Sequence, residues 1–450
     1  MFNFSEIKKS HGLALVISGL IFALNLHVEN IIPQIAALFA LGVYFFVISK
    51  YDNYINIFLM SYLFFASYLL VSTFYFFNSF PLWLALVIFF ASPALYVFST
   101  ALLIIPAIRR SIYKMPILAI SFGLFSYMLL SVYPFETWTI PHIAYSQSAN
   151  YLLLGLLPYI GFFGFFAVLV AIGYLNYLVI KSTIQKPRIL ALYGAVFCAI
   201  FLFTHYDTKR QGMSEERDFT FIGVQHWFYA DTSAYEQKQS FKKKENIDTL
   251  LRIAKEKYSE LLANGGVSEN KPVIIAFGEI DITQEQMEYV KEQTNGEPYY
   301  MSFSYEGYEE GEDKEYPYNK MALLHQGQLL YAGYKEQRAP HEKIAEKKND
   351  LSVYHKINGK KFFSSICYDL TFLSTNAYLK GKDIIIGHIN DFNYGVVFAQ
   401  IHKRNIIFRA VENEVDIFAA GTTGPTFYAN KDGVVTGEML PFYKNLVAVY

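Results

Sequence analysis

The chain has 450 residues, of which 53% are hydrophobic, 18% aromatic and only 17% charged. A net charge of −1, without a basic arm or basic helix, gives no reason to expect nucleic acid as a partner. The length allows two or three domains, and most charged residues follow residue 205. One of the two cysteines lies within an apolar segment, so a disulfide framework is not indicated.

Residues 1–205 form successive apolar segments of about 20 residues each, the length that spans a bilayer. The first is expected to be a retained helix, because no small-residue cleavage site follows it. A soluble helical core would need seven buried helices with almost no polar face. We therefore predict a membrane domain of about seven helices, at 11–28, 31–49, 54–77, 81–107, 116–133, 151–180 and 189–205.

Basic residues flank these segments on alternate sides. They are Lys8, Lys9, Lys50, Arg109, Arg110, Lys114, Lys181, Lys186 and Arg188. The other connections, at 29–30, 78–80 and 134–150, contain no Lys or Arg. By the positive-inside rule the N-terminus is cytoplasmic, and seven spans deliver the C-terminal half to the outer face.

The connection at 134–150 contains Trp138, His142 and Tyr145 and is too long for a tight turn. Aromatic residues at this depth often only anchor the membrane interface. A long aromatic loop beside an outer domain could instead line an entry for a lipid or peptide.

The C-terminal half changes to a soluble α/β composition after a polar linker at 206–218. Short strands that alternate with helices predict a mixed α/β layer sandwich over residues 219–450. The acidic, tyrosine-rich segment 305–318 is expected to be a solvated loop or a lid. Helices are predicted at 242–262, 283–293, 370–379 and 396–414. Strands are predicted at 219–227, 273–277, 321–325, 328–334, 362–366, 384–389, 416–420, 427–428, 434–435 and 445–450.

Cys367 ends the apolar strand at 362–366 and precedes the predicted helix at 370–379. A helix N-terminus favours the thiolate, which is the reactive form of cysteine. A single cysteine in an apolar run is, however, more often a small buried hydrophobe. His388 and His402 lie downstream without a papain-like context, and a lone histidine is usually structural. No metal-ligand spacing, glycine-rich phosphate loop or GxSxG elbow is present.

Two further reactive groups lie at strand ends. Glu279 follows the strand at 273–277, and Lys335 follows the strand at 328–334. A carboxylate can accept the thiol proton of Cys367, and an ammonium can stabilise the oxyanion of a tetrahedral intermediate. Each residue alone is a weak signal, because a charged side chain at a strand end is usually only solvated.

The order Glu279, Lys335, Cys367 resembles the nitrilase (carbon–nitrogen hydrolase) superfamily and its membrane branch, the apolipoprotein N-acyltransferases. The family's ICYE nucleophile motif resembles Ile366-Cys367-Tyr368-Asp369, and its SNDAWFG motif resembles the stretch with Asn390 and Asp391. Its YxK…VPFGE element resembles Tyr334-Lys335 through Glu342. Further likenesses lie at Ala276-Phe277-Gly278-Glu279, Val224-Gln225, Phe408-Arg409-Ala410-Val411-Glu412-Asn413-Glu414, Thr422-Thr423-Gly424 and the outer connection through Tyr145-Ser146-Gln147.

The resemblance implies an αββα, nitrilase-like sandwich and a ping-pong acyl transfer without a cofactor or metal. Glu279 would deprotonate Cys367, which takes an acyl chain from the sn-1 ester of a phospholipid as a thioester. Lys335, with backbone donors near Tyr368, would hold the oxyanion. The α-amine of a diacylglyceryl-cysteine at a lipoprotein N-terminus would then resolve the thioester. Glu342, Tyr368, Asp369, Asn390 and Asp391 are the expected supporting or substrate-binding residues.

The same resemblance places the protein in the bacterial plasma (inner) membrane, with its catalytic domain on the periplasmic or outer face, as an expected monomer. Three residues depart from the family pattern: Asp369 replaces Glu, Asn393 replaces Trp and Gly278 replaces Pro. The family's eighth span is expected to be missing, because the sequence stops at a predicted strand. These departures bear on substrate recognition more than on acyl-enzyme chemistry.

Two alternatives stay open from the sequence. A membrane-tethered amidase or nitrilase would keep Glu279, Lys335 and Cys367 and use water as the acceptor. Seven spans disfavour it, because a small polar substrate needs no bilayer. A catalytically inactive receptor or scaffold that binds lipoproteins is disfavoured by the intact set of three reactive residues.

The charge pattern makes a testable prediction about topology. In intact cells, a membrane-impermeant thiol reagent should label the variant Glu309→Cys but not the variant Lys114→Cys. Labelling of Lys114→Cys alone would reverse the predicted orientation.

Overall fold

The computed structural model describes most of the chain in two compact units. The described residues are 8–27, 30–73, 82–131, 142–213, 217–225, 242–267, 271–280, 282–309, 315–338, 342–350, 354–373, 376–391, 394–439 and 446–449. The units are Met1–Arg210 and Gln211–Tyr450. The last helix of the first unit runs through Met213, so residues 206–213 are helical instead of forming the expected polar linker.

The first unit is helical. Its long helices are α1 (Lys9–Asn25), α2 (Ile31–Ser49), α3 (Tyr54–Ser72), α5 (Leu82–Val97), α7 (Lys114–Ser131), α9 (Leu157–Thr183) and α10 (Pro187–Met213). Short pieces follow or join them: η2 (Phe98–Ile104), α6 (Pro106–Arg109), η4 (Ile143–Gln147) and α8 (Tyr151–Leu154). In the described part of the chain, five helical segments are long and apolar enough to cross a membrane, and α1 and α7 are shorter apolar helices.

Glycines allow α2 and α9 to pack closely. A Cβ atom at Gly42 would lie 2.6 Å from the Cβ of Asn176, and one at Gly173 would lie 2.5 Å from the Leu41 side chain. Asn176 also donates a hydrogen bond from Nδ2 to the Leu38 carbonyl on α2, at 2.9 Å. Small residues and interhelical hydrogen bonds are the usual means by which helices associate in an apolar medium.

The second half of the connection predicted as an outer loop is buried inside this unit. Residues 142–150 are all buried, while residues 134–141 lie outside the described residues. Gln147 donates to the Gln34 carbonyl at 3.0 Å, and the Gln34 side chain accepts from the Ala149 N–H at 2.9 Å. These bonds satisfy the backbone carbonyl of Gln34 and the backbone N–H of Ala149, which are buried away from water. The described part of the connection is therefore not an exposed loop.

The second unit contains two sheets. The first has seven strands, with the order β13 (Leu446–Val449), β1 (Thr220–Gln225), β2 (Val273–Phe277), β4 (Tyr300–Gly307), β5 (Tyr318–His325) and β6 (Gln328–Tyr334), and β3 (Ile282–Thr283) beside β4. The second has the order β12 (Val435–Met439), β11 (Thr426–Ala429), β10 (Asp416–Gly421), β9 (Ile384–Ile389), β8 (Lys360–Ile366) and β7 (His355–Ile357). Strands β1, β2 and β4 are parallel, as are β8, β9 and β10.

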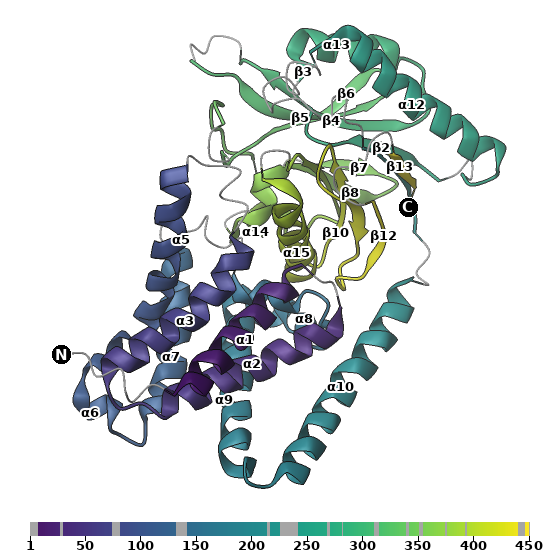
Figure 1. The fold of residues 1–450 in the computed structure, drawn as a ribbon. Coiled ribbons are helices and arrows are strands. Elements are labelled where there is room, and N and C mark those ends of the chain that lie inside the picture. The colour runs from purple at the N-terminus through teal and green to yellow at the C-terminus, as the bar shows by residue number, and fades with distance from the viewer. Residues whose placement is uncertain are drawn as a thin grey trace. The chain divides into compact units, whose positions relative to one another are not determined.

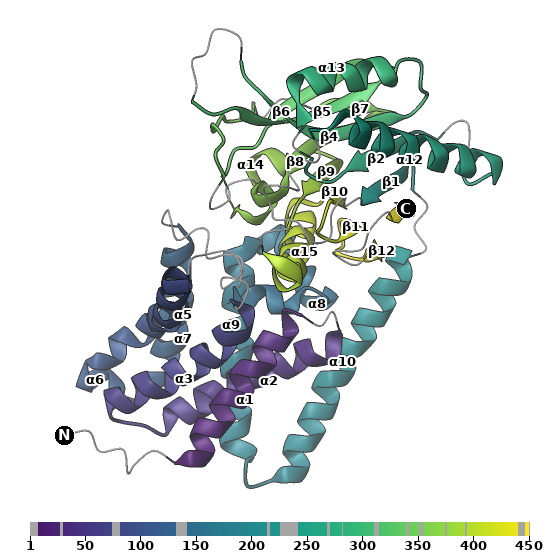
Figure 2. The same ribbon diagram turned by 45° about the horizontal axis from the view of Figure 1, so that its top comes forward.

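Alternation along β1 shows how the layers stack. Ile222 and Val224 belong to a core cluster that also contains residues of α12 (Lys244–Ala263) and α13 (Gln284–Gln293). Phe221, on the other face, lies 4.8 Å from Phe418 of the second sheet, measured between ring centroids. Helices α14 (Asn376–Leu379) and α15 (Gly395–Asn413) complete the sandwich next to the second sheet, opposite α12 and α13 (Figures 1 and 2). The expected αββα fold is confirmed.

Several local predictions differ from the structure. Strands β3, β4 and β7 were not predicted. The end of β4 and the start of β5 occupy the two ends of the segment 305–318, which was expected to be a loop. Residues 310–314 of that loop, and residues 226 and 227 of the first predicted strand, lie outside the described residues. The predicted continuous helix at 370–379 is wrong, because in the described part of that stretch η5 (Cys367–Thr371) ends before α14 begins at Asn376.

The α2–α9 contact gives a prediction about stability. The variant Gly42→Val should lower the free energy of unfolding by about 1–3 kcal/mol, because the added atoms would overlap Asn176. The midpoint of thermal unfolding in detergent measures this change. The matched control is Gly194→Val on α10, where a Cβ atom meets nothing within 4 Å. Equal unfolding midpoints for the two variants would contradict close packing of α2 on α9.

Candidate active site

Several predicted site residues follow the carboxyl ends of strands, two in the first sheet and two in the second. Glu279 comes after β2, Lys335 after β6, Cys367 after β8, and Asn390 and Asp391 after β9. The carboxyl ends of parallel strands meet at one edge of a sheet, so β8 and β9 bring Cys367 and Asn390 together. The Cys367 Sγ atom lies 3.8 Å from the Asn390 carbonyl oxygen.

Lys335 lies between two carboxylates. Its Nζ atom is 2.9 Å from Glu279 Oε1 and 2.6 Å from Glu342 Oε1, and the lysine side chain is fully buried. Burial alone would lower the pKa of Lys335, but the charges of Glu279 and Glu342 raise it well above its usual value. The side chain is therefore an ammonium ion at neutral pH.

Asn319 of β5 was not predicted, yet it holds both members of this ion pair. Its Nδ2 atom donates to Glu279 Oε1 at 2.7 Å, and its carbonyl accepts from the Lys335 N–H at 2.8 Å. The sequence offered no signal for it, because an asparagine in a strand reveals its partner only through the pairing of β5 with β6.

The backbone at Glu279 is fixed by the end of β9 and by the turn that follows β10. The Glu279 N–H donates to the Ile389 carbonyl, and Thr422 Oγ1 donates to the Glu279 carbonyl at 3.1 Å. A Cβ atom at Gly278 would lie only 2.0 Å from the Thr422 nitrogen. Glycine is therefore required at position 278, because any side chain would push these segments apart.

Cys367 occupies a strained backbone position at the end of β8. Its φ angle is +40°, in the left-handed region, where a non-glycine residue costs about 1–3 kcal/mol. The other non-glycine residues with positive φ in the described part of the chain are Gln326, Asn358 and Glu414, which lie in turns and at a helix end. The sharp turn expected at Cys367 is present, but the five-residue η5 replaces the helix expected to favour its thiolate.

The environment of Cys367 favours the thiol. Burial raises its pKa well above the usual value, the Glu279 charge raises it further, and the Lys335 ammonium opposes both. The resting residue is therefore protonated near neutral pH, and its reaction needs a base that removes the proton as the new bond forms. Glu279 and Lys335, which are 2.9 Å apart, are the two charged groups that act most strongly on the thiol.

Asp369 connects the nucleophile turn to the segment after Lys335. Its carboxylate accepts from the backbone N–H groups of Glu336 and Gln337, at 3.0 and 2.8 Å. Burial raises the pKa of Asp369 to about 8. These two hydrogen bonds hold the turn at Cys367 against the segment that follows Lys335. Tyr368, which precedes it, is also buried, and burial raises the pKa of its phenol.

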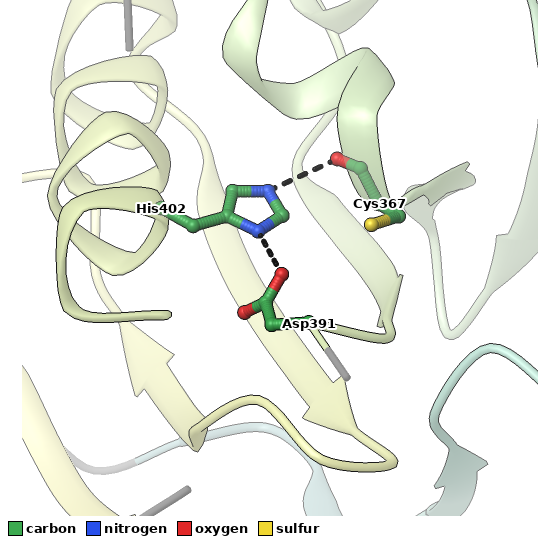
Figure 3. A group of neighbouring side chains, drawn as sticks. All are labelled: Cys367, Asp391 and His402. Carbon is green, nitrogen blue, oxygen red and sulfur yellow. Dashed lines mark hydrogen bonds and ion pairs between the residues drawn. The ribbon is translucent and has the colours of Figure 1, made fainter. Parts of the chain in front are cut away.

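Asn390 and Asp391 have different neighbours. Asn390 Oδ1 accepts from Thr423 Oγ1 at 2.9 Å, whereas Asp391 Oδ1 lies 2.9 Å from His402 Nδ1. The other ring nitrogen of His402 lies 3.1 Å from the Cys367 carbonyl oxygen, as Figure 3 shows. His402 was not predicted as a site residue, because its position on α15 gives no local sign of this contact.

The donor atoms of Cys367, Asp391 and His402 all lie within 4.8 Å of one another. Such a trio can hold a metal ion, but both ring nitrogens of His402 already make hydrogen bonds within the protein. The arrangement therefore fits a hydrogen-bonded chain better than an open set of metal ligands.

His388 and Tyr394 complete the surroundings. His388 bonds the Phe277 carbonyl at 2.7 Å and the Ser302 hydroxyl at 3.0 Å, which links the two sheets. Burial lowers the pKa of His388 to about 4, so it is neutral and structural. Tyr394 precedes α15, and burial raises the pKa of its phenol. Asn393 lies outside the described residues.

Comparisons with known proteins give one sequence relative. The chain is 30% identical over 112 residues to Apolipoprotein N-acyltransferase 1 of Treponema denticola. The match covers 22% of this chain and 21% of that protein. No model of a protein family matches the chain. Because the chain matches only about a fifth of the relative's length, the activity of the whole relative is not carried over by similarity alone.

Solved structures also resemble part of the chain. A mutant amidase from Nesterenkonia sp. AN1, with the acetamide moiety of fluoroacetamide added to its active-site cysteine, is 15% identical with a TM-score of 0.40. The match covers 52% of this chain and 89% of the amidase. The glutamine-dependent NAD+ synthetase from Acinetobacter baumannii is 16% identical with a TM-score of 0.39, over 51% of this chain and 45% of that one.

The charges around Cys367 predict opposite effects of two substitutions. Glu279→Gln removes a negative charge that raises the thiol pKa, so alkylation by iodoacetamide should begin at lower pH. Lys335→Met removes a positive charge that lowers the thiol pKa, so alkylation should begin at higher pH. The rate of alkylation as a function of pH, followed by intact-protein mass, measures both shifts. Shifts in the same direction would contradict this account of the thiol.

Proposed function

We propose that this chain, a divergent relative of the apolipoprotein N-acyltransferases, moves an acyl chain from a phospholipid to the N-terminal amine of a diacylglyceryl lipoprotein. The observation that carries the proposal is the cluster of buried Glu279 and Lys335 with the partly exposed Glu342, whose Glu279 and Lys335 charges act on the strained Cys367. The same chain contains five helical segments of membrane-spanning length and composition among its described residues. A carboxylate, an ammonium and a thiol suit acyl transfer through a thioester.

In the first half-reaction, Cys367 attacks the sn-1 ester carbonyl of the phospholipid. Glu279 accepts the thiol proton as the sulfur–carbon bond forms, which overcomes the raised pKa of the thiol. The Lys335 ammonium and the backbone N–H of Tyr368 stabilise the oxyanion. The carbon–oxygen bond then breaks, Glu279 returns the proton to the leaving alkoxide, and lysophospholipid departs.

In the second half-reaction, the α-amine of the diacylglyceryl-cysteine attacks the thioester. Glu279 accepts a proton from the amine, the amide bond forms, and the thiolate of Cys367 leaves and is reprotonated. Glu342, whose carboxylate bonds the Lys335 ammonium at 2.6 Å, keeps that cation in place through both halves. No cofactor or metal is required for either step.

The helical unit supports lipid substrates on energetic grounds. Extracting an acyl chain into water costs about 0.8 kcal/mol for each CH₂ group, which a soluble domain would have to offset. Helices that keep both substrates in an apolar medium avoid that cost. We propose accordingly that the protein resides in the bacterial inner membrane, with its N-terminus in the cytoplasm and the second unit on the outer face.

Hydrolysis of a carbon–nitrogen bond is the second candidate, in which water instead of an amine resolves the thioester. The cluster of Glu279, Lys335 and Cys367 suits this reaction equally well. The membrane-length helices favour the transferase, because a small polar amide has no need of a bilayer.

Intact-protein mass measurement tests the proposal. After incubation with phospholipid vesicles, the protein should gain the mass of one acyl chain on Cys367. The adduct should be absent in Cys367→Ala, which lacks the sulfur, and in Glu279→Gln, which lacks the base. Cys198→Ala, at the other free cysteine, is the matched control and should still be acylated.

The same samples separate the two candidates. Release of the acyl chain on addition of a diacylglyceryl-cysteine peptide, with formation of its amide, supports the transferase. Turnover of a simple amide without any adduct from phospholipid would overturn it in favour of hydrolysis.

A further inference from the structure

The pair His402–Asp391 lies directly behind the nucleophile. Both side chains are fully buried, and His402 stands on α15 between the Cys367 carbonyl and the Asp391 carboxylate (Figure 3). Asp391 lies two residues after β9 and Cys367 directly follows β8, so the pair links the ends of these strands to α15. Neither side chain is needed as the base, because Glu279 has that part in the proposed function.

Hydrogen-bond chemistry fixes the protons of this pair. The Cys367 carbonyl oxygen can only accept, so His402 Nε2 must carry a hydrogen. His402 Nδ1 and Asp391 Oδ1 are 2.9 Å apart, and one more proton must lie between them. Whichever atom holds it, the pair is neutral overall, as its burial demands. Neither ring nitrogen of His402 then has a free lone pair, so the imidazole cannot accept the thiol proton.

The hydrogen bond from His402 to the Cys367 carbonyl also sets the direction of the Tyr368 N–H. A trans peptide is planar, and its N–H points opposite to its C=O. Because His402 holds the Cys367 carbonyl, it also directs the Tyr368 N–H away from itself. Without this bond, the peptide at Cys367 would be free to relax from φ +40° towards ordinary strand geometry.

We propose that His402 and Asp391 are positioning residues for acylation: they hold the Cys367–Tyr368 peptide so that its N–H meets the oxyanion. Asp391 keeps the imidazole in the orientation that presents Nε2–H to the carbonyl. Gly424 leaves space for this carboxylate, since a Cβ atom there would lie 2.6 Å from Asp391 Oδ2. The inference rests on the proposed function only in requiring that Cys367 is acylated.

The test compares two reactions of Cys367 in the full-length protein in detergent. Acylation by p-nitrophenyl acetate passes through an oxyanion, whereas alkylation by iodoacetamide does not. His402→Leu should slow the p-nitrophenolate burst about 100-fold, as loss of one oxyanion donor does. The alkylation rate should change by less than about threefold, because the thiol keeps Glu279 and Lys335.

Two conservative variants guard against a simple folding defect. His402→Gln keeps an N–H for the carbonyl, and Asp391→Asn can donate to Nδ1 and keep Nε2–H in place. The burst rate of Asp391→Asn should be at least about tenfold higher than that of Asp391→Ala. The burst rate of His402→Gln should recover part of what is lost in His402→Leu. The matched control is His355→Leu on β7, which should leave both reactions unchanged.

Equal loss of both reactions in His402→Leu, or an unchanged burst, would overturn the proposal. So would equal burst rates in Asp391→Asn and Asp391→Ala. Because p-nitrophenyl acetate is not a lipid, the result does not depend on whether phospholipid is the natural donor.

Discussion

The buried ammonium of Lys335 is the interaction on which the site depends. A lone cation without solvent exposure would be strongly unfavourable, and two carboxylates at 2.9 and 2.6 Å make it tolerable. The same pair gives opposite influences on Cys367, since Glu279 raises the thiol pKa and Lys335 lowers it. The net effect is a raised pKa, so the thiol is protonated at neutral pH.

The sandwich makes this arrangement possible by joining its sheets at the site. His388 connects β9 to β2 and β4, and the turn after β10 bonds the carbonyl of Glu279 through Thr422. Glu279 belongs to the first sheet layer and Cys367 to the second. The positions of Glu279 and Cys367 relative to each other therefore depend on how the two layers are packed. Gly278 lies so close to Thr422 that the two layers cannot shift towards each other at this point.

Much of this could be predicted from the sequence, because apolar runs and charge mark strands and membrane-length helices. The strands that carry Glu279, Lys335 and Cys367 are where the pattern put them. The helix expected after Cys367 was wrong, since helix-compatible residues do not reveal that the chain is held as a short turn by tertiary contacts. Asn319 and His402 could not be predicted, because each finds its partner across strands or layers far apart in sequence.

The short η5 after Cys367, in place of the predicted helix, has a consequence for the chemistry of the thiol. A long helix would have stabilised the thiolate at rest, and the enzyme would then need no base at the moment of attack. With the short η5 after Cys367 and burial raising the thiol pKa, the reaction that we propose relies on Glu279 as a base at the moment of attack. In the proposed reaction, one of the two oxyanion donors is the Tyr368 N–H, in the peptide that follows the strained Cys367. That peptide is the group whose carbonyl His402 holds.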